Sequence, residues 1–276
     1  MLNYGSNCSM LPLCLTIAGS DPAGGAGIQL DLAVFRSLGV YGMSVISVIT
    51  AQTASRVYSA SPVSNEQFSR QLQCLSSQYQ FSAIKIGILD PELIETLKNF
   101  LSQASCPVIL DPVLKSSSGH VFLDAGRFSE VIPLVTLITP NVPEAELLSS
   151  KSISSLSDMI TASELILSCY SSNGGALKGV LVKGSHLGKE KGASDVFSWL
   201  DESGDVVTEI FSTCYKELQW EVHGTGCFLS SAITALVANG ADFSRAIKES
   251  KELIESYLAK SVRLPGDKSG VFVFFD

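Results

Sequence analysis

The chain has 276 residues, of which 46% are hydrophobic, and its formal net charge at pH 7 is −8. A chain of this size and composition can bury a full core, and it is far from the composition of disordered proteins. Because lysine and arginine form no cluster, the sequence argues against nucleic acid and anionic membranes as partners and favours a small-molecule ligand.

Membrane insertion and secretion are also disfavoured. Gly, Ser, Asp or Lys interrupts every apolar stretch before it reaches the length of about 18 residues that a membrane span needs. Residues 10–18 resemble the core of a signal peptide, but the first basic residue is Arg36, so we expect a strand there. Seven cysteines without a C-x-x-C pair favour reduced thiols over a disulfide or zinc framework. A cytoplasmic location is therefore expected.

Apolar and β-branched runs predict strands, and apolar residues spaced by three and four predict helices. We expect a lead-in over residues 1–12 and one domain over 13–276. The predicted strands are 13–18, 45–50, 83–88, 108–113, 136–139, 179–182 and 271–275, with a hairpin of 195–200 and 206–211. The predicted helices are 28–38, 64–75, 90–101, 156–166, one beginning near 228, and 244–262. This alternation predicts a mostly parallel sheet that helices cover on both faces.

The segment 223–227 (His-Gly-Thr-Gly-Cys) leads directly into one of these helices. Gly224 and Gly226 let the backbone approach a ligand closely, and the free N–H groups at a helix N-terminus attract anions. The same position would stabilise a thiolate, so we expect Cys227 to have a lowered pKa. The alternative is a plain turn in which Cys227 is a small buried hydrophobic residue.

Further polar residues follow the predicted strands, where ligands bind in parallel sheets. Lys183 suits polyphosphate oxygens, and the spacing Asn141-x-x-Glu144 suits a hydrated Mg²⁺. Gln52 carries a donor and an acceptor side by side and can pair with an aminopyrimidine edge. Together with Asp111, which ends another strand, these residues predict phosphoryl transfer by positioning and charge neutralisation.

Each of these residues also has a purely structural explanation. Lys183 can be a solvated lysine, Gln52 a partner for loop backbone, and Asp111 a turn former before Pro112. Asn141 and Glu144 can be the cap and first turn of a helix. His186 and His223 are expected to be hydrogen-bonding loop residues. The coincidence of so many polar groups at strand ends favours the functional interpretation.

Eight short segments occur in order along the chain: 16–22, 24–29, 39–42, 85–87, 111–113, 138–145, 182–184 and 223–227. Together they resemble the hydroxymethylpyrimidine/phosphomethylpyrimidine kinases of thiamine synthesis, which belong to the ribokinase-like superfamily. The resemblance runs from about residue 13 to 260. It implies a three-layer α/β/α fold and two successive ATP-dependent phosphorylations, first of the hydroxymethyl group and then of the monophosphate. It also implies Mg²⁺ as a cofactor and a homodimer.

The resemblance also implies roles for individual residues. Those that would contact the pyrimidine are Gln52, Asp31, Ala26, Val113 and Ile88. Those that would form the nucleotide site and anion hole are Gly224, Thr225, Gly226 and Lys183. Those that would bind the metal are Asn141, Glu144 and Asp111. Cys227 would aid deprotonation of the substrate hydroxyl, together with Lys183 as a catalytic residue.

Three departures from the family pattern leave the substrate open. Ile88 stands in place of a methionine, Val222 in place of a threonine, and residues 115–119 carry their lysine two positions early. A pyridoxal or pyridoxine kinase of the same superfamily is therefore an alternative. A protein that binds a pyrimidine without catalysis, as a regulator, is a second alternative.

Overall fold

A computed structural model describes residues 11–114, 125–184, 193–213 and 220–274 of the chain. Most of the predicted lead-in, the segment 115–119 and His186 lie outside these residues.

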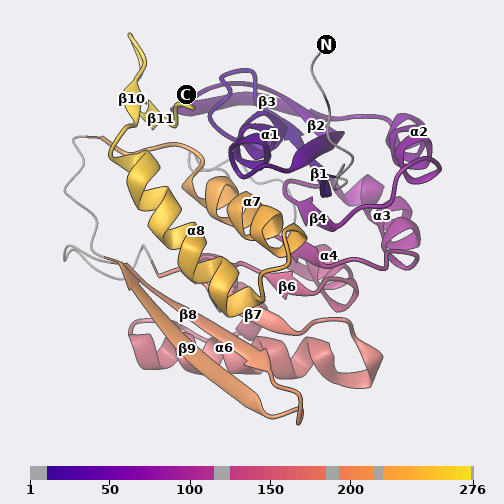
Figure 1. The fold of residues 1–276 in the computed structure, drawn as a ribbon, viewed down its shortest axis with the longest axis vertical. Helices are drawn as coiled ribbons and strands as arrows, with labels where there is room; N and C mark the ends of the chain where they lie inside the picture. Colours follow the sequence, from indigo (N-terminus) through magenta and orange to yellow (C-terminus); the bar gives the residue numbers. More distant parts are fainter. Residues whose placement is uncertain (1–10, 115–124, 185–192, 214–219, 275–276) are drawn as a thin grey trace, which may run out of the picture.

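A large sheet forms the centre of the molecule, with strand order β3-β2-β1-β4-β5-β6-β7-β8-β9 (Figure 1). The strands from β2 to β7 in this order run parallel, whereas β3, β8 and β9 extend the two edges with antiparallel pairing. The strands are β1 (Leu13–Ser20), β2 (Tyr41–Thr53), β3 (Arg56–Pro62), β4 (Ala83–Ile86), β5 (Val108–Leu110), β6 (Leu137–Ile138), β7 (Gly179–Val182), β8 (Ala193–Leu200) and β9 (Val206–Thr213).

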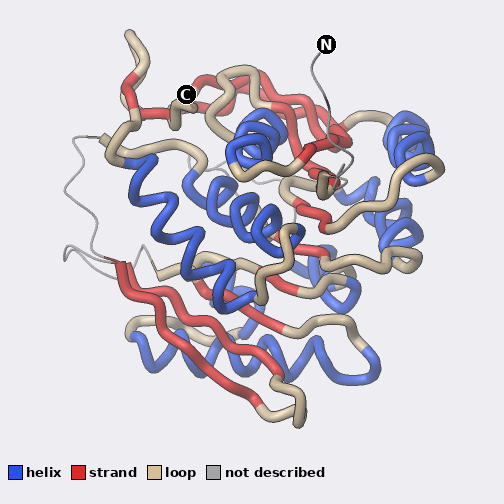
Figure 2. The backbone as a smooth tube through the Cα atoms, viewed as in Figure 1, coloured by secondary structure: helices blue, strands red, loops and turns tan. Residues whose placement is uncertain are grey.

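Helices cover both faces of this sheet, which confirms the three-layer α/β/α prediction (Figure 2). One layer contains α1 (Gly27–Ser37), α7 (Thr225–Ala238) and α8 (Phe243–Leu258). The other contains α2 (Asn65–Ser76), α3 (Ile94–Leu101), α4 (Ala125–Ser129), α5 (Val142–Ser149) and α6 (Leu156–Ser171). Short 3₁₀ helices occupy Pro91–Leu93, Ile132–Leu134 and Ser172–Gly174. In the part of the chain that is described, no helix has the length and apolar character needed to cross a bilayer.

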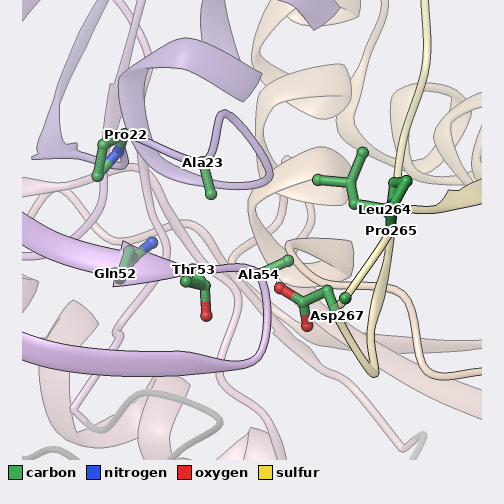
Figure 3. Close-up of a pocket in the computed structure, with 9 residues that line it drawn as sticks. Pro22, Ala23, Gln52, Thr53, Ala54, Leu264, Pro265 and Asp267 are labelled. Atoms are coloured by element: carbon green, nitrogen blue, oxygen red, sulfur yellow. The ribbon is translucent and has the colours of Figure 1, made fainter.

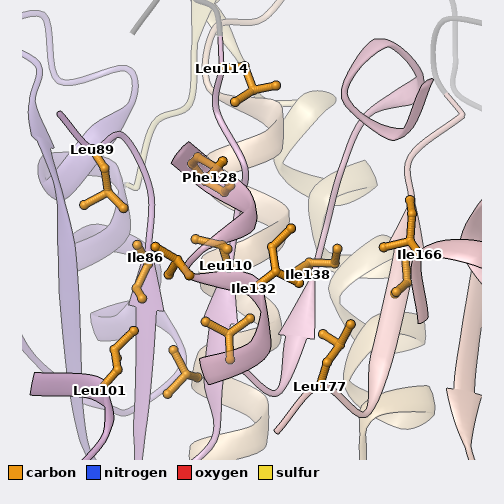
Figure 4. Packing of buried hydrophobic residues seen from close by; sticks show 14 of the residues in the cluster. Ile86, Leu89, Leu101, Leu110, Leu114, Phe128, Ile132, Ile138, Ile166 and Leu177 are labelled. Carbon is orange, nitrogen blue, oxygen red and sulfur yellow. The ribbon is translucent and has the colours of Figure 1, made fainter. Parts of the chain in front are cut away.

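The larger core lies between the sheet and the layer of α2 to α6 (Figure 4). Ile86, Leu110 and Ile138 project from three parallel strands onto Leu101 and Phe128. Because helices cover these strands on both faces, their residues are buried on both sides. This double burial explains why the strands appear in the sequence as continuous apolar runs without alternation.

Polar side chains fix where several helices begin. Ser64 and Asp90 accept hydrogen bonds from the backbone N–H groups of Gln67 and Glu92. Ser155 and Asp242 cap α6 and α8 in the same way. These caps satisfy N–H groups that have no partner within the helix.

Two predictions about strands were wrong. The strand predicted to end at Thr50 continues to Thr53 and turns back into β3, so Gln52 lies within a hairpin. Most residues of β3 are exposed, so they lack the apolar pattern by which a strand is recognised in a sequence. The final strand is also shorter than predicted.

At the C-terminus, Gly270–Val271 (β11) pair with Val262–Arg263 (β10) in a separate two-stranded sheet. The aromatic residues after β11 pack instead of pairing: Phe272 and Phe274 lie against Phe228 of α7, with ring centroids 4.7 and 6.1 Å away. Their apolar run therefore reflects burial against a helix rather than membership of the central sheet.

Candidate active site

Two glycine-containing segments meet where α1 and α7 begin. Gly224 has a φ of 84°, and a Cβ at this position would lie 2.0 Å from the carbonyl oxygen of Gly25. Gly27 has a φ of 58°, and a Cβ there would lie 2.3 Å from the carbonyl oxygen of Gly19. Only glycine fits such a backbone without displacement. The loop 21–27 and the turn 223–227 are therefore packed directly on each other, with two helix N-termini beside them.

Lys183 and Asp111 form an ion pair next to this turn, with 2.8 Å between Lys183 Nζ and Asp111 Oδ1. A Cβ on Gly226 would lie 3.3 Å from the same Nζ. Burial would lower the pKa of Lys183, but Asp111 and Glu144 raise it above its usual value. Burial would likewise raise the pKa of Asp111, but Lys183 and Lys85 hold it below its usual value. Both groups are therefore charged at neutral pH.

Asn141 and Glu144 form a capping box at the start of α5. Asn141 Oδ1 accepts from the Glu144 N–H at 2.9 Å, and Glu144 Oε2 accepts from the Asn141 N–H at 2.8 Å. The Glu144 carboxylate also accepts from the backbone of Leu114. Burial raises the pKa of Glu144 to about 7, although Lys183 lowers it. The structural role considered from the sequence is thus confirmed, and metal binding by this pair stays a prediction.

Asn141 and Glu144 nevertheless belong to the same cluster as Lys183, because Asn141 forms a parallel bridge with Lys183. Oxygen donors for a cation are therefore close to the proposed phosphate contacts. Over the residues that the structure describes, no group of three or more His, Cys, Asp and Glu side chains is arranged to hold a metal.

The Cys227 thiol is half-buried in the first turn of α7, and its sulfur accepts a hydrogen bond from the Gly27 backbone. Burial raises the pKa of Cys227 to about 11; Lys85 opposes this shift, whereas Asp111 and Asp31 add to it. The sequence-based expectation of a lowered pKa is therefore wrong. Loss of solvation and two nearby carboxylates outweigh the favourable effect of the helix N-terminus.

Gln52 is connected to the turn 223–227 through Asp21. The Asp21 carboxylate accepts a hydrogen bond from the Gln52 side chain, and its Oδ2 lies 3.4 Å from Nε2 of His223. It also accepts from the backbone N–H groups of Ala23 and Ala26, at 2.8 and 2.9 Å. Although burial would raise the pKa of Asp21, His223 and Gln52 hold it below its usual value. Gln52 and Cys227 therefore both contact the loop 21–27, Gln52 at Asp21 and Cys227 at Gly27. We call the region of this loop, Gln52, Lys183 and the turn 223–227 the rim.

The other four residues that were predicted to contact the pyrimidine differ in how far they are buried. Ala26, Ile88 and Val113 are half-buried; Ala26 lies in the loop 21–27, and the Val113 N–H donates to the carbonyl of Asp111. Ile88 approaches Gly19, at the start of the loop that Asp21 organises, because a Cβ added to Gly19 would lie 3.7 Å from Ile88 Cδ1. Asp31, in contrast, has no exposed surface at all.

Asp31 lies in a buried polar network rather than at the substrate. Its two oxygens accept from Lys85 Nζ at 2.9 and 2.8 Å, from Thr16 Oγ1 at 2.6 Å and from Ser231 Oγ at 2.7 Å. Burial would lower the pKa of Lys85, but Asp31 raises it well above its usual value. The prediction that Asp31 contacts the substrate is contradicted by this position, because protein donors surround its carboxylate.

Gln52 also lines a pocket of about 370 Å³, shown in Figure 3. Its walls come from the loop before α1, the β2–β3 turn and the β10–β11 hairpin: Pro22, Ala23, Gln52, Thr53, Ala54, Leu264, Pro265, Gly266 and Asp267. Among the predicted substrate contacts, only Gln52 lines it. The Pro265-Gly266 pair in the sequence predicts a turn, but no neighbouring residue indicates that this turn lies beside Gln52 in the fold. Sequence reasoning missed Asp21 and the 264–267 turn as parts of the candidate site, and it missed Lys85 as the buried partner of Asp31.

A family model described as phosphomethylpyrimidine kinase matches residues 21–271. The chain is 36% identical over 261 residues to the hydroxymethylpyrimidine/phosphomethylpyrimidine kinase of Rhizobium meliloti, covering 92% of this chain and 93% of that protein. It is similar to the crystal structure of phosphomethylpyrimidine kinase from Clostridium difficile 630, with 34% identity, a TM-score of 0.74 and coverage of 89% and 98%. An ADP complex of Bacillus subtilis pyridoxal kinase has 30% identity, a TM-score of 0.80 and coverage of 95% and 96%.

Replacing Asp31 tests the buried network. Asp31→Ala leaves the Lys85 ammonium buried without a partner, so we expect the free energy of unfolding to fall by roughly 3–5 kcal/mol in urea titrations. Glu66→Ala is the control, because it removes an exposed ion pair with Arg70 and should change stability by about 1 kcal/mol or less. Similar losses in the two variants would contradict the importance of the network.

Replacing Gly224 tests the contact between the two glycine segments. Gly224→Ala and Gly204→Ala both place a side chain at a φ of 84°, which costs roughly 1–2 kcal/mol. Only at Gly224 does the new Cβ collide with backbone, whereas Gly204 has open space around it. We therefore expect a loss of turnover of at least about tenfold for Gly224→Ala, and little change for Gly204→Ala in the same steady-state assay. Equal turnover in the two variants would show that this contact does not matter for the reaction.

Proposed function

The chain belongs to the phosphomethylpyrimidine kinase family, and we propose that the rim formed by Gln52, Lys183 and the turn 223–227 carries out its reaction. ATP phosphorylates the hydroxymethyl group of hydroxymethylpyrimidine, and a second ATP converts the monophosphate to the diphosphate, as a step of thiamine synthesis or salvage. The observation that carries this proposal is the ion pair of Lys183 and Asp111 beside Gly226, on the same rim as Gln52.

On the nucleotide side, the protein neutralises negative charge. The ammonium of Lys183 and the N–H groups at the start of α7 face the position proposed for the transferred phosphoryl group. The raised pKa of Lys183 keeps it protonated in the physiological range. In phosphoryl transfer such positioning and charge neutralisation provide most of the catalysis. The glycines of the turn allow the backbone to approach the phosphate oxygens without a side chain between them.

The residues present also fit Mg²⁺. Asp111, Asn141 and Glu144 offer oxygen atoms, which this ion prefers, and they lie close to Lys183. All three side chains already accept hydrogen bonds from protein groups, so we propose that they hold the ion largely through its bound waters. When bound, Mg²⁺ would neutralise phosphate charge in the transition state.

The proposed role of Cys227 changes with its raised pKa. A thiol whose pKa is about 11 is protonated at neutral pH and is a poor general base. We propose instead that Cys227 orients the substrate hydroxyl toward the phosphate, with its own sulfur fixed by the Gly27 N–H. The loose transition state of phosphoryl transfer demands little deprotonation before the P–O bond forms.

Pyridoxal kinase activity is the second candidate, favoured by the fold similarity to the Bacillus subtilis enzyme. A homodimer and a cytoplasmic location complete the proposal, as the family resemblance implies.

A substrate panel with purified protein, ATP and Mg²⁺ tests the function. We expect hydroxymethylpyrimidine and its monophosphate to be phosphorylated with a kcat/KM above that for pyridoxal. Gln52→Ala should raise the KM for the pyrimidine about tenfold, because it removes two hydrogen-bonding groups, and leave the KM for ATP unchanged. The exposed Gln78→Ala is the control. Preference for pyridoxal, or equal effects of Gln52→Ala on the two KM values, would refute the assignment.

Cys227→Ala tests the proposed role of the thiol. We expect kcat to fall about tenfold, as for loss of one orienting hydrogen bond, while the KM for the pyrimidine stays the same. Because the thiol pKa is about 11, the group is protonated from about pH 6 to 9, and its titration should not appear in the kcat profile there. An inflection in the wild type that Cys227→Ser abolishes would instead identify a thiolate base.

A further inference from the structure

The β10–β11 hairpin is connected to the candidate active site at its base. The N–H of Gly270 donates to the carbonyl of Glu221 at 2.8 Å, and the N–H of His223 donates to the carbonyl of Gly270 at 2.9 Å. Val222, which directly precedes the turn 223–227, therefore forms a parallel bridge with Gly270 of β11 (Gly270–Val271).

This base has no free space around it. A Cβ on Gly270 would lie 2.2 Å from Nε1 of Trp220, and a Cβ on Gly25 would lie 3.2 Å from Cγ1 of Val271. Only glycine fits between Trp220 and the carbonyl of Val262 without displacing one of them. The hairpin is thus fixed against both glycine segments of the site.

The tip of the hairpin is attached to a different element, the β2–β3 turn. The Asp267 carboxylate accepts hydrogen bonds from the Ala54 backbone and the Ser55 side chain. It also accepts from the N–H groups of Lys268 and Ser269 in its own turn, at 2.7 and 3.3 Å. Figure 3 shows Asp267 beside Ala54, with Leu264 and Pro265 on the same side of the pocket. One carboxylate therefore both shapes the turn and holds it next to the strand that carries Gln52.

Leu264 and Pro265 line the pocket with apolar surface. The Leu264 side chain remains 37% exposed, although it adjoins the apolar wall of Ala23 and Ala54. A flat heteroaromatic ring held by Gln52 would remove this surface from water, which is favourable. A polar anchor opposite apolar walls is the usual construction of a small-molecule pocket.

We propose that residues 264–267 are a specificity-determining wall of the substrate pocket, and that Asp267 is the positioning residue that holds this wall against the β2–β3 turn. The wall faces the end of the substrate that Gln52 binds, away from the alcohol that reacts beside Cys227. This inference rests on the proposed function, because it assigns the pocket to the alcohol substrate.

The experiment uses the full chain with the substitutions Asp267→Ala, Asp267→Asn and Leu264→Ala. Asp267→Ala should raise the KM for hydroxymethylpyrimidine about fivefold, because the wall is no longer held, while kcat and the KM for ATP change by less than about twofold. Asp267→Asn should restore part of the affinity, since its amide oxygen still accepts from the Ala54 N–H. Lys268→Ala, an exposed neighbour outside the pocket, is the matched control.

Leu264→Ala tests the wall without touching its attachment. It should shift the ratio of kcat/KM values by at least about threefold toward a pyrimidine alcohol with one extra methylene on the ring, because it enlarges the pocket. If Asp267→Ala fails to fold, Leu264→Ala still tests the proposed wall. Unchanged KM and unchanged selectivity in the folded variants would overturn the proposal. A fall in kcat at constant KM would also overturn it.

Failure of the proposed function gives a different result. If the wild type phosphorylates pyridoxal but neither pyrimidine, the assigned reaction is wrong. The same three variants assayed with pyridoxal then still test the wall. A changed KM for pyridoxal supports the wall, and an unchanged KM for pyridoxal overturns it.

Discussion

The active-site architecture depends on one carboxylate that never contacts solvent. Asp31 collects hydrogen bonds from Lys85, Thr16 and Ser231, and these four residues come from α1, β4, β1 and α7. Because α1 and α7 begin with the two glycine segments, the buried pair fixes the relative position of the loops that face the ligand. An ion pair without exposed surface is tolerable only when its hydrogen-bonding groups have partners, and here the surrounding hydroxyl groups complete the set.

A second buried ion pair supports the backbone beside Lys183 in the same manner. Lys251 of α8 donates to Asp195 of β8, and the other oxygen of Asp195 accepts from the Gly184 N–H at 2.9 Å. Gly184 follows Lys183 directly, so this hydrogen bond fixes the backbone next to Lys183. Both ion pairs are buried below the loops of the candidate site. Lys183, which pairs with the buried Asp111, is therefore held in place before any ligand arrives.

Much of this arrangement could be predicted from the sequence because its signals are local. Apolar runs identified the parallel strands, and their common direction brought Asp111, Lys183 and Gly226 together at one edge. The predictions that failed concern properties that depend on residues far away in the sequence. An aspartate inside a helix gives no sign of a lysine 54 residues away, so the burial of Asp31 was missed. The pKa of Cys227 likewise depends on its burial and on Lys85, Asp111 and Asp31, which come from three other segments.

The hairpin that follows α8 contributes no strand to the central sheet, yet its turn borders the pocket. Substitutions in this turn leave the two main cores and the buried pairs untouched, because none of their residues comes from 264–267. If residues 264–267 contact the ligand as proposed, ligand choice can change at this turn while both cores and both buried ion pairs stay constant.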